Sequence, residues 1–128
     1  MPLVHISLLK GKTPSYVRAI ADGVHRALSE TYNAPPDDRF QLVHQLEPGE
    51  LIYDPDYLGV HRTDDLVVIH ITAGKWRDTA TKSAFYKRTA DLLAASPGLR
   101  PEDVMIVMAP NDRDDWSFGN GKASYVET

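Results

Sequence analysis

The chain has 128 residues, of which 42% are hydrophobic and 25% charged, with a formal net charge of −4 and no cysteine. This length fits one compact domain, residues 1–128, and the composition is that of a soluble globular protein. The negative charge argues against a nucleic-acid partner, the absence of cysteine excludes disulfides and thiol chemistry, and no apolar run is long enough to cross a membrane. We expect a cytoplasmic protein without a signal peptide.

The chain begins with Met1 and Pro2, followed by an apolar run over Leu3–Leu9 that predicts a buried strand. A proline is tolerated at the first position of a strand. Methionine aminopeptidases remove Met1 when the second residue is small, which would leave Pro2 as a secondary amine. A terminal amine has a pKa of about 7.7–8, so it can act as an acid or a base near neutrality. The alternative is that Pro2 is a chance residue after an ordinary start codon.

The rest of the first half predicts a helix and a second strand. Thr13 and Pro14 are a typical helix start, and apolar residues follow at helical spacing as far as Thr31. A Pro-Pro turn then precedes an alternating segment from Arg39 to Leu46, which predicts a strand with Phe40 and Leu42 on one side. A turn and a short extended segment, 51–53, complete this half.

The second half repeats this order. The run from Leu66 to Ala73 predicts a strand, and a helix follows the loop over 74–79. We expect this helix to bury Ala80, Ala84, Phe85, Thr89, Leu92 and Leu93, and to end at Ser96-Pro97-Gly98. A strand over Val104–Met108 and an aromatic, glycine-rich tail follow.

These two pseudo-repeats, about 1–60 and 61–128, predict an α/β (α+β) fold. Each strand–helix–strand unit implies a parallel strand pair, and together they give a four-stranded mixed sheet with two helices on one face. The other sheet face lacks cover, which predicts oligomerisation. We expect the strand at 66–73 to run parallel to the strand at 3–9. The loop after it then need not lie beside Pro2 within one chain, and a neighbouring subunit could close the gap.

Lys75 and Arg77 lie in the loop before the second helix. Two cations at a helix N-terminus form an anion site, although both could equally be solvated loop charges. Asp38 follows the Pro-Pro turn, where it could pair with Arg39 or cap the turn.

Trp116 and Phe118 have the spacing of two residues on one face of a strand or hairpin, so they form either core or interface packing, or the apolar wall of a pocket. His5, His44 and His70 fall on predicted strands, but no histidine pair has a recognised zinc spacing, and we predict no metal site.

Two segments carry a family resemblance. Residues 34–41 (APPDDRFQ) and 115–123 (DWSFGNGKA) are similar to segments of the malonate semialdehyde decarboxylase branch of the tautomerase superfamily, and Phe85-Tyr86-Lys87 adds to the match. The similarity runs essentially from end to end. It implies a homotrimer of β-α-β repeats, with sheets packed around a barrel-like core, and an enzyme that needs no cofactor.

The resemblance also implies roles for individual residues. Pro2, once Met1 is lost, matches the catalytic amino-terminal proline, and Asp38 matches the active-site aspartate. Arg77 matches the second of two substrate-binding arginines. Lys75 stands in place of the first, in a loop about one residue longer, and a lysine lacks the bidentate fork of an arginine. Trp116 and Phe118 match the hydrophobic pocket wall.

The activity implied is decarboxylation of a small 3-oxo acid such as malonate semialdehyde. A keto-enol tautomerase acting on 2-oxo acids, of the 4-oxalocrotonate or phenylpyruvate type, needs the same residues. A third possibility is a catalytically silent trimeric binding protein, if Met1 is retained and Pro2 is therefore an amide.

Overall fold

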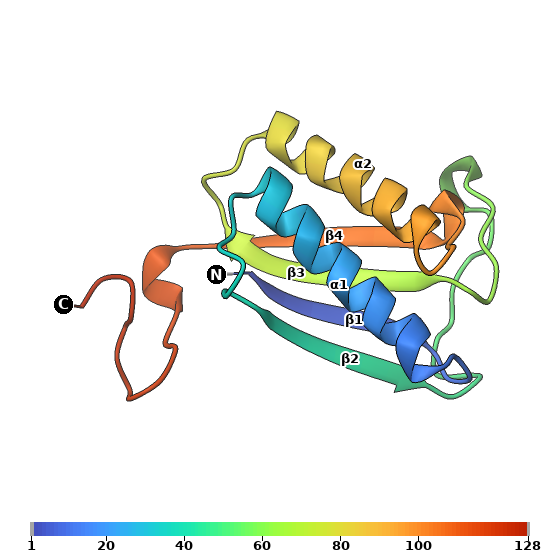
Figure 1. Cartoon of the computed structure of the whole chain (residues 1–128), viewed down its shortest axis with the longest axis horizontal. Helices are drawn as coiled ribbons and strands as arrows, with labels where there is room; N and C mark the ends of the chain where they lie inside the picture. The colour runs from blue at the N-terminus through green and yellow to red at the C-terminus, as the bar shows by residue number, and fades with distance from the viewer. Residues whose placement is uncertain (1, 128) are drawn as a thin grey trace.

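The computed structural model describes residues 2–127 and contains one four-stranded sheet with two helices packed on one face (Figure 1). The elements in chain order are β1 (Leu3–Leu9), α1 (Pro14–Thr31), β2 (Phe40–Leu46), β3 (Val67–Gly74), α2 (Thr79–Ala95) and β4 (Val104–Asn111). Short 3₁₀ turns lie at Tyr57–Gly59, Pro101–Asp103 and Arg113–Asp115. The predicted mixed sheet and the placement of both helices are therefore confirmed.

The sheet order is β2-β1-β3-β4, and the two halves run in opposite directions. β1 and β2 are parallel, as are β3 and β4, whereas β1 and β3 are antiparallel with Leu3 opposite Thr72. The expectation that the third strand runs parallel to the first was wrong. The reason is that β2 ends beside the end of β1, and the connection over residues 47–66 stays at that edge, so β3 must run back.

Both helices begin at side-chain caps. The Thr13 hydroxyl accepts a hydrogen bond from the Tyr16 amide at 3.2 Å, and the Asp78 carboxylate accepts one from the Thr81 amide at 2.8 Å. Such caps satisfy amides that have no partner within the helix, and they fix where each helix starts.

The core lies between the helices and the sheet. It contains Val4, Ile6, Leu8, Ile20, Val24, Leu28, Tyr32, Val67, Ile69, Ile71, Phe85 and Leu93. Alternate strand residues point inward and one stripe of each helix faces them, as the residue spacing predicts. Ala80 and Ala84 are exposed, contrary to expectation, because α2 buries the narrower stripe of Phe85, Thr89 and Leu93.

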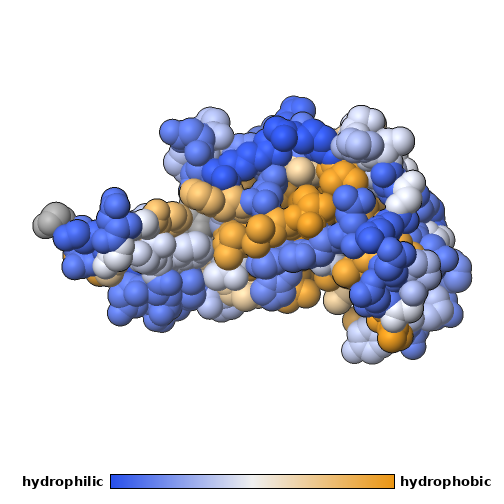
Figure 2. Space-filling model, turned by 90° about the horizontal axis from the view of Figure 1, so that it is seen from below, coloured by the Kyte–Doolittle hydropathy of each residue, from blue (hydrophilic) through white to orange (hydrophobic). Residues whose placement is uncertain are grey.

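The opposite face of the sheet has no helix over it. Phe40 and Leu42 of β2 are 50% and 48% exposed, and Met105 and Val107 of β4 are also exposed. Seen from below, the body of the molecule shows a band of apolar side chains (Figure 2). None of the helices within residues 2–127 is long and apolar enough to span a membrane.

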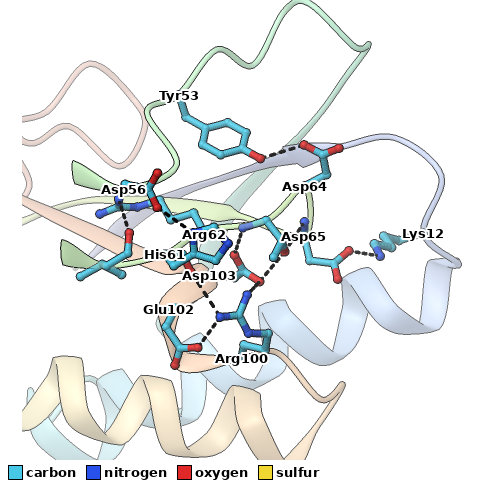
Figure 3. A network of polar contacts seen from close by, with 12 residues as sticks. Lys12, Tyr53, Asp56, His61, Arg62, Asp64, Asp65, Arg100, Glu102 and Asp103 are labelled. Atoms are coloured by element: carbon cyan, nitrogen blue, oxygen red, sulfur yellow. Dashed lines mark hydrogen bonds and ion pairs between the residues drawn. The ribbon is translucent and has the colours of Figure 1, made fainter. Parts of the chain in front are cut away.

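A polar network secures the 47–66 connection at the edge of the sheet where β4 begins (Figure 3). Asp103 is fully buried, and its two carboxylate oxygens accept hydrogen bonds from the amide and the hydroxyl of Thr63, each at 2.7 Å. Tyr53 donates to Asp64 at 2.8 Å close by. Because these bonds hold the connection in place, they help to set the direction of β3.

Candidate active site

The starts of β1 and β2 and the ends of β3 and β4 meet at one edge of the sheet (Figure 1). Leu3 pairs with Phe40, which places Pro2 next to the end of the Pro-Pro turn at Asp38. Leu3 also lies opposite Thr72, so the loop after β3 starts beside Pro2 in the same chain. The expected gap between Pro2 and this loop does not exist, because β3 is antiparallel to β1.

Pro2 is buried at the start of a core strand. Met1, on whose removal the amine hypothesis depends, lies outside the described residues. Asp38 is half-buried, and its amide donates to the Pro35 carbonyl at 3.0 Å, which closes the turn before β2. The neighbouring Arg39 donates to Asp22 at 2.7 Å.

Arg77 is held by a carbonyl and two aromatic rings. Its Nη2 donates to the backbone carbonyl of Tyr32 at 2.8 Å, and its Cζ lies 5.1 Å from the ring centre of Tyr32 and 5.0 Å from that of Trp76. Its Nη1 is buried and has no hydrogen-bond partner among residues 2–127. Burial lowers the pKa of Arg77 below its ordinary value. Within the described chain the guanidinium forms no ion pair, so its charge remains available to an anion.

Lys75 has a different environment. It is exposed, and its Nζ forms an ion pair with Asp112 at 2.9 Å. The hydrogen bond to Asp112 raises the pKa of Lys75. The two cations of the loop are therefore not equivalent, because a carboxylate of the chain already neutralises Lys75.

The tail residues form an aromatic cluster at the same edge. The indole of Trp116 donates to the Asn111 side chain at 2.9 Å and stacks on Phe118 at a centroid distance of 5.4 Å. Phe118 also lies 5.8 Å from Phe40 at the start of β2 and 5.3 Å from Tyr125. This cluster brings the tail close to the strand that neighbours Pro2.

Four further residues at this edge were missed by the sequence analysis: Tyr32, Trp76, Arg113 and Tyr125. Arg113 lies 5.3 Å from the Trp76 ring centre and 5.9 Å from that of Tyr125. Burial raises the pKa of Tyr32 to about 12, and its hydroxyl has no partner within residues 2–127. The sequence signal was the pair Trp76-Arg77, and an arginine next to an aromatic residue is too common to be specific.

Two hollows could receive a small anion. One of about 250 Å³ is lined by Tyr32, Trp76 and Arg77, and also by Asp78, whose carboxylate is engaged by the Thr81 amide at the start of α2. A larger one of about 580 Å³ lies between α1 and β2 and contains Lys12, Arg18 and Arg39. Each of these three cations is already paired with Asp65 or Asp22, so the smaller hollow is the better anion site.

The chain is similar to known proteins over nearly its whole length. A family model described as a tautomerase enzyme matches residues 38–119, and a second model of the same description matches residues 2–61. The chain is 42% identical to the probable tautomerase YusQ of Bacillus subtilis (strain 168), over 99% of this chain and all of that one. The chain belongs to the tautomerase superfamily.

Solved structures place this chain near the malonate semialdehyde decarboxylase branch of the superfamily. One set, which includes wild-type, proline-to-alanine mutant and inactivated malonate semialdehyde decarboxylase, matches with a TM-score of 0.91 and 31% identity, covering 97% of this chain and 95% of that one. A second such enzyme, FG41 malonate semialdehyde decarboxylase inhibited by 3-bromopropiolate, matches with a TM-score of 0.91 and 36% identity, over 97% and 94% of the two chains.

A fused 4-OT symmetric trimer matches with a TM-score of 0.78 over 98% of this chain and 99% of that one. At 18% identity this likeness shows the fold alone.

The strand histidines do meet, on the open face of the sheet. His5 Nδ1 lies 2.8 Å from His44 Nε2, and the His70 ring lies 6.3 Å from that of His5. Within residues 2–127, however, the one compact group of three potential metal ligands is Asp112, Asp114 and Asp115, all exposed. Exposed acidic groups are common without an ion.

Proposed function

We propose that this member of the tautomerase superfamily is a cofactor-free, cytoplasmic enzyme that acts on small oxo acids, most specifically as a malonate semialdehyde decarboxylase. The observation that carries the proposal is the state of Arg77. Its guanidinium has a buried Nη1 without a partner and forms no ion pair within residues 2–127, although Asp78 lines the same hollow, and it lies at the sheet edge where Pro2 precedes β1. A small carboxylate bound at Arg77 would therefore lie close to a terminal amine on Pro2.

In this mechanism, removal of Met1 makes Pro2 a secondary amine. Its protonated form donates to the carbonyl oxygen of the 3-oxo acid and so stabilises the enolate that develops there. The electron pair of the bond between the carboxylate carbon and C2 moves toward the carbonyl, carbon dioxide leaves, and C2 takes up a proton. A neutral Pro2 could instead form an iminium with the aldehyde, which serves as the same electron sink.

The other residues have supporting roles. Arg77 binds the carboxylate and holds it out of the carbonyl plane. Asp38 positions the Pro2 amine or a water molecule. Trp116 and Phe118 supply an apolar wall, which favours the departure of the carboxylate as neutral carbon dioxide. Lys75, already paired with Asp112, contributes less to substrate binding.

A second candidate is a keto-enol tautomerase, in which neutral Pro2 acts as a base and moves a proton between the enol oxygen and carbon. The observation in its favour is the 42% identity to a probable tautomerase over nearly the whole chain. Activity on malonate semialdehyde and on phenylenolpyruvate, compared side by side, separates the two reactions. Release of carbon dioxide from malonate semialdehyde supports the decarboxylase. Loss of the enol absorbance of phenylenolpyruvate at a rate above that without enzyme supports the tautomerase.

We also propose a homotrimer as the working assembly. The exposed apolar residues of β2 and β4 need cover, and the segment after β4 extends away from the body (Figure 1). A related fold, the fused 4-OT, is described as a symmetric trimer. Sedimentation equilibrium should give three times the chain mass at micromolar concentration, and a monomer would refute this assembly.

Intact mass spectrometry comes first among the tests of function, because the proposal requires the loss of one methionine. Incubation with 3-bromopropiolate should then add one adduct to the peptide that begins at Pro2. A chain that keeps Met1 in its native host would instead support a silent trimeric binding protein.

A further inference from the structure

Gly74, the last residue of β3, lies directly under the indole of Trp76. A Cβ built on Gly74 would lie 1.9 Å from Trp76 Cη2 and 2.0 Å from Cζ3, distances that no side chain can occupy. Gly74 is not among the glycines with positive φ, so its backbone conformation is open to other residues. Glycine here leaves the space that the ring occupies, and any larger residue would displace the Trp76 ring.

The Trp76 ring in turn contacts two guanidinium groups. Arg77 Cζ lies 5.0 Å and Arg113 Cζ 5.3 Å from the centre of the ring. Arg77 also contacts the Tyr32 ring at 5.1 Å. These contacts link the end of α1, the loop after β3 and the start of the tail.

An arginine that must bind a substrate carboxylate needs an orienting contact that leaves its charge free. A carboxylate partner would orient the guanidinium but compete with the substrate, whereas an aromatic face attracts the cation without neutralising it. The single hydrogen bond of Arg77 within residues 2–127 goes to the Tyr32 carbonyl, which leaves the rings to fix the rest of its orientation.

We propose that Trp76 is a positioning residue that orients Arg77 for the substrate carboxylate, and that Gly74 provides the space in which the Trp76 ring lies. This inference rests on the proposed function, because it requires Arg77 to bind a small carboxylic acid. It also explains why the last residue of β3 is a glycine. Arg113 supplies a second cation beside the Trp76 ring.

The test is a double-mutant cycle of Gly74→Ala and Trp76→Ala. Each single change should raise KM for the oxo acid on the order of tenfold, with a smaller change in kcat and an unaltered melting temperature. If Gly74 acts only by admitting the ring, Gly74→Ala should add nothing in the Trp76→Ala background. Gly23→Ala is the control for adding a methyl group elsewhere: its Cβ would lie 2.7 Å from Cδ2 of the buried Leu93, within the helix layer and away from the Trp76 ring, so it should leave KM unchanged whatever it does to stability.

Binding of 3-hydroxypropionate, measured by calorimetry, gives a readout independent of turnover. Wild type should bind it, Arg77→Ala should lose binding, and Gly74→Ala and Trp76→Ala should each weaken it about tenfold. Wild-type affinity in both of the latter variants would overturn the positioning role while leaving the proposed function intact. No binding and no turnover by wild type would overturn the proposed function, and this inference with it.

A substitution series at Trp76 covers the case in which Gly74→Ala fails to fold. Trp76→Phe keeps an aromatic face and should give a KM between those of wild type and Trp76→Ala. Trp76→Leu fills space without a π-face and should resemble Trp76→Ala. A Trp76→Leu variant with the KM of wild type would show that the Trp76 ring only fills space and does not orient Arg77.

Discussion

Replacing Arg77 by alanine should damage substrate binding far more than stability. In the folded protein the guanidinium makes one hydrogen bond, to the Tyr32 carbonyl, and has a buried Nη1 without a partner in the described chain. Its loss removes the hydrogen bond to the Tyr32 carbonyl, about 0.5–1.5 kcal/mol, and the contacts with the Tyr32 and Trp76 rings, about 0.5–1 kcal/mol each. It also removes an unsatisfied buried donor, which offsets part of that cost, so the melting temperature should fall by only a few degrees.

The expected loss in catalysis is larger. A charge-assisted contact to a carboxylate contributes about 1.5–3 kcal/mol, which corresponds to roughly a 10- to 150-fold drop in kcat/KM. Steady-state kinetics on malonate semialdehyde measures it, with Arg18→Ala as control, because Arg18 is 71% exposed and pairs only with Asp22 on its own helix. Arg77→Lys should recover part of the loss, since it keeps the charge without the fork. An unchanged kcat/KM in a folded Arg77→Ala protein would show that Arg77 is a solvated loop charge that does not bind the substrate.

Three further changes test other parts of the molecule. Lys75→Ala should reduce kcat/KM less than Arg77→Ala does, because Asp112 already neutralises Lys75; an equal or larger loss would contradict this ranking. Asp103→Ala should lower the free energy of unfolding by about 1–3 kcal/mol in urea titrations, since it leaves the half-buried Thr63 amide and hydroxyl without acceptors; wild-type stability would rule out that role. Arg88, followed by Arg26, lowers the pKa of Glu30 to about 2, so its contribution to stability is present above about pH 4.5 and is lost as the pH falls toward 2. The difference in melting temperature between wild type and Glu30→Gln should therefore narrow over that range, and a constant difference would refute the pairing.

The elements of the fold were predictable because they depend on local patterns. The apolar run over Leu3–Leu9 and the helical spacing after Thr13 are properties of neighbouring residues, and the structure has a strand and a helix at these places. The direction of β3 was not predictable in this way. It depends on where the 47–66 connection is fastened, and the fastening joins Thr63 to Asp103, forty positions apart in the chain.

The candidate site, too, could be predicted from the sequence only in part. Residues assigned by resemblance, such as Asp38 and Arg77, do lie at one edge of the sheet, although their roles remain predictions. The surroundings of Arg77 were missed, because Tyr32 ends α1 and Arg113 follows β4, and only the antiparallel arrangement brings them to the loop after β3. A sequence pattern cannot distinguish a solvated loop arginine from one held between two rings.

The central claim is that the amine of Pro2 performs the chemistry, and blocking that amine tests it most directly. Two preparations are compared by intact mass and by turnover of malonate semialdehyde: one begins at Pro2, and the other retains Met1. An amide nitrogen neither titrates near neutrality nor forms an iminium, so the preparation that retains Met1 should fold normally and show no turnover. Full activity in a chain verified to carry Met1 would contradict the amino-terminal mechanism and leave Asp38 as the next candidate base.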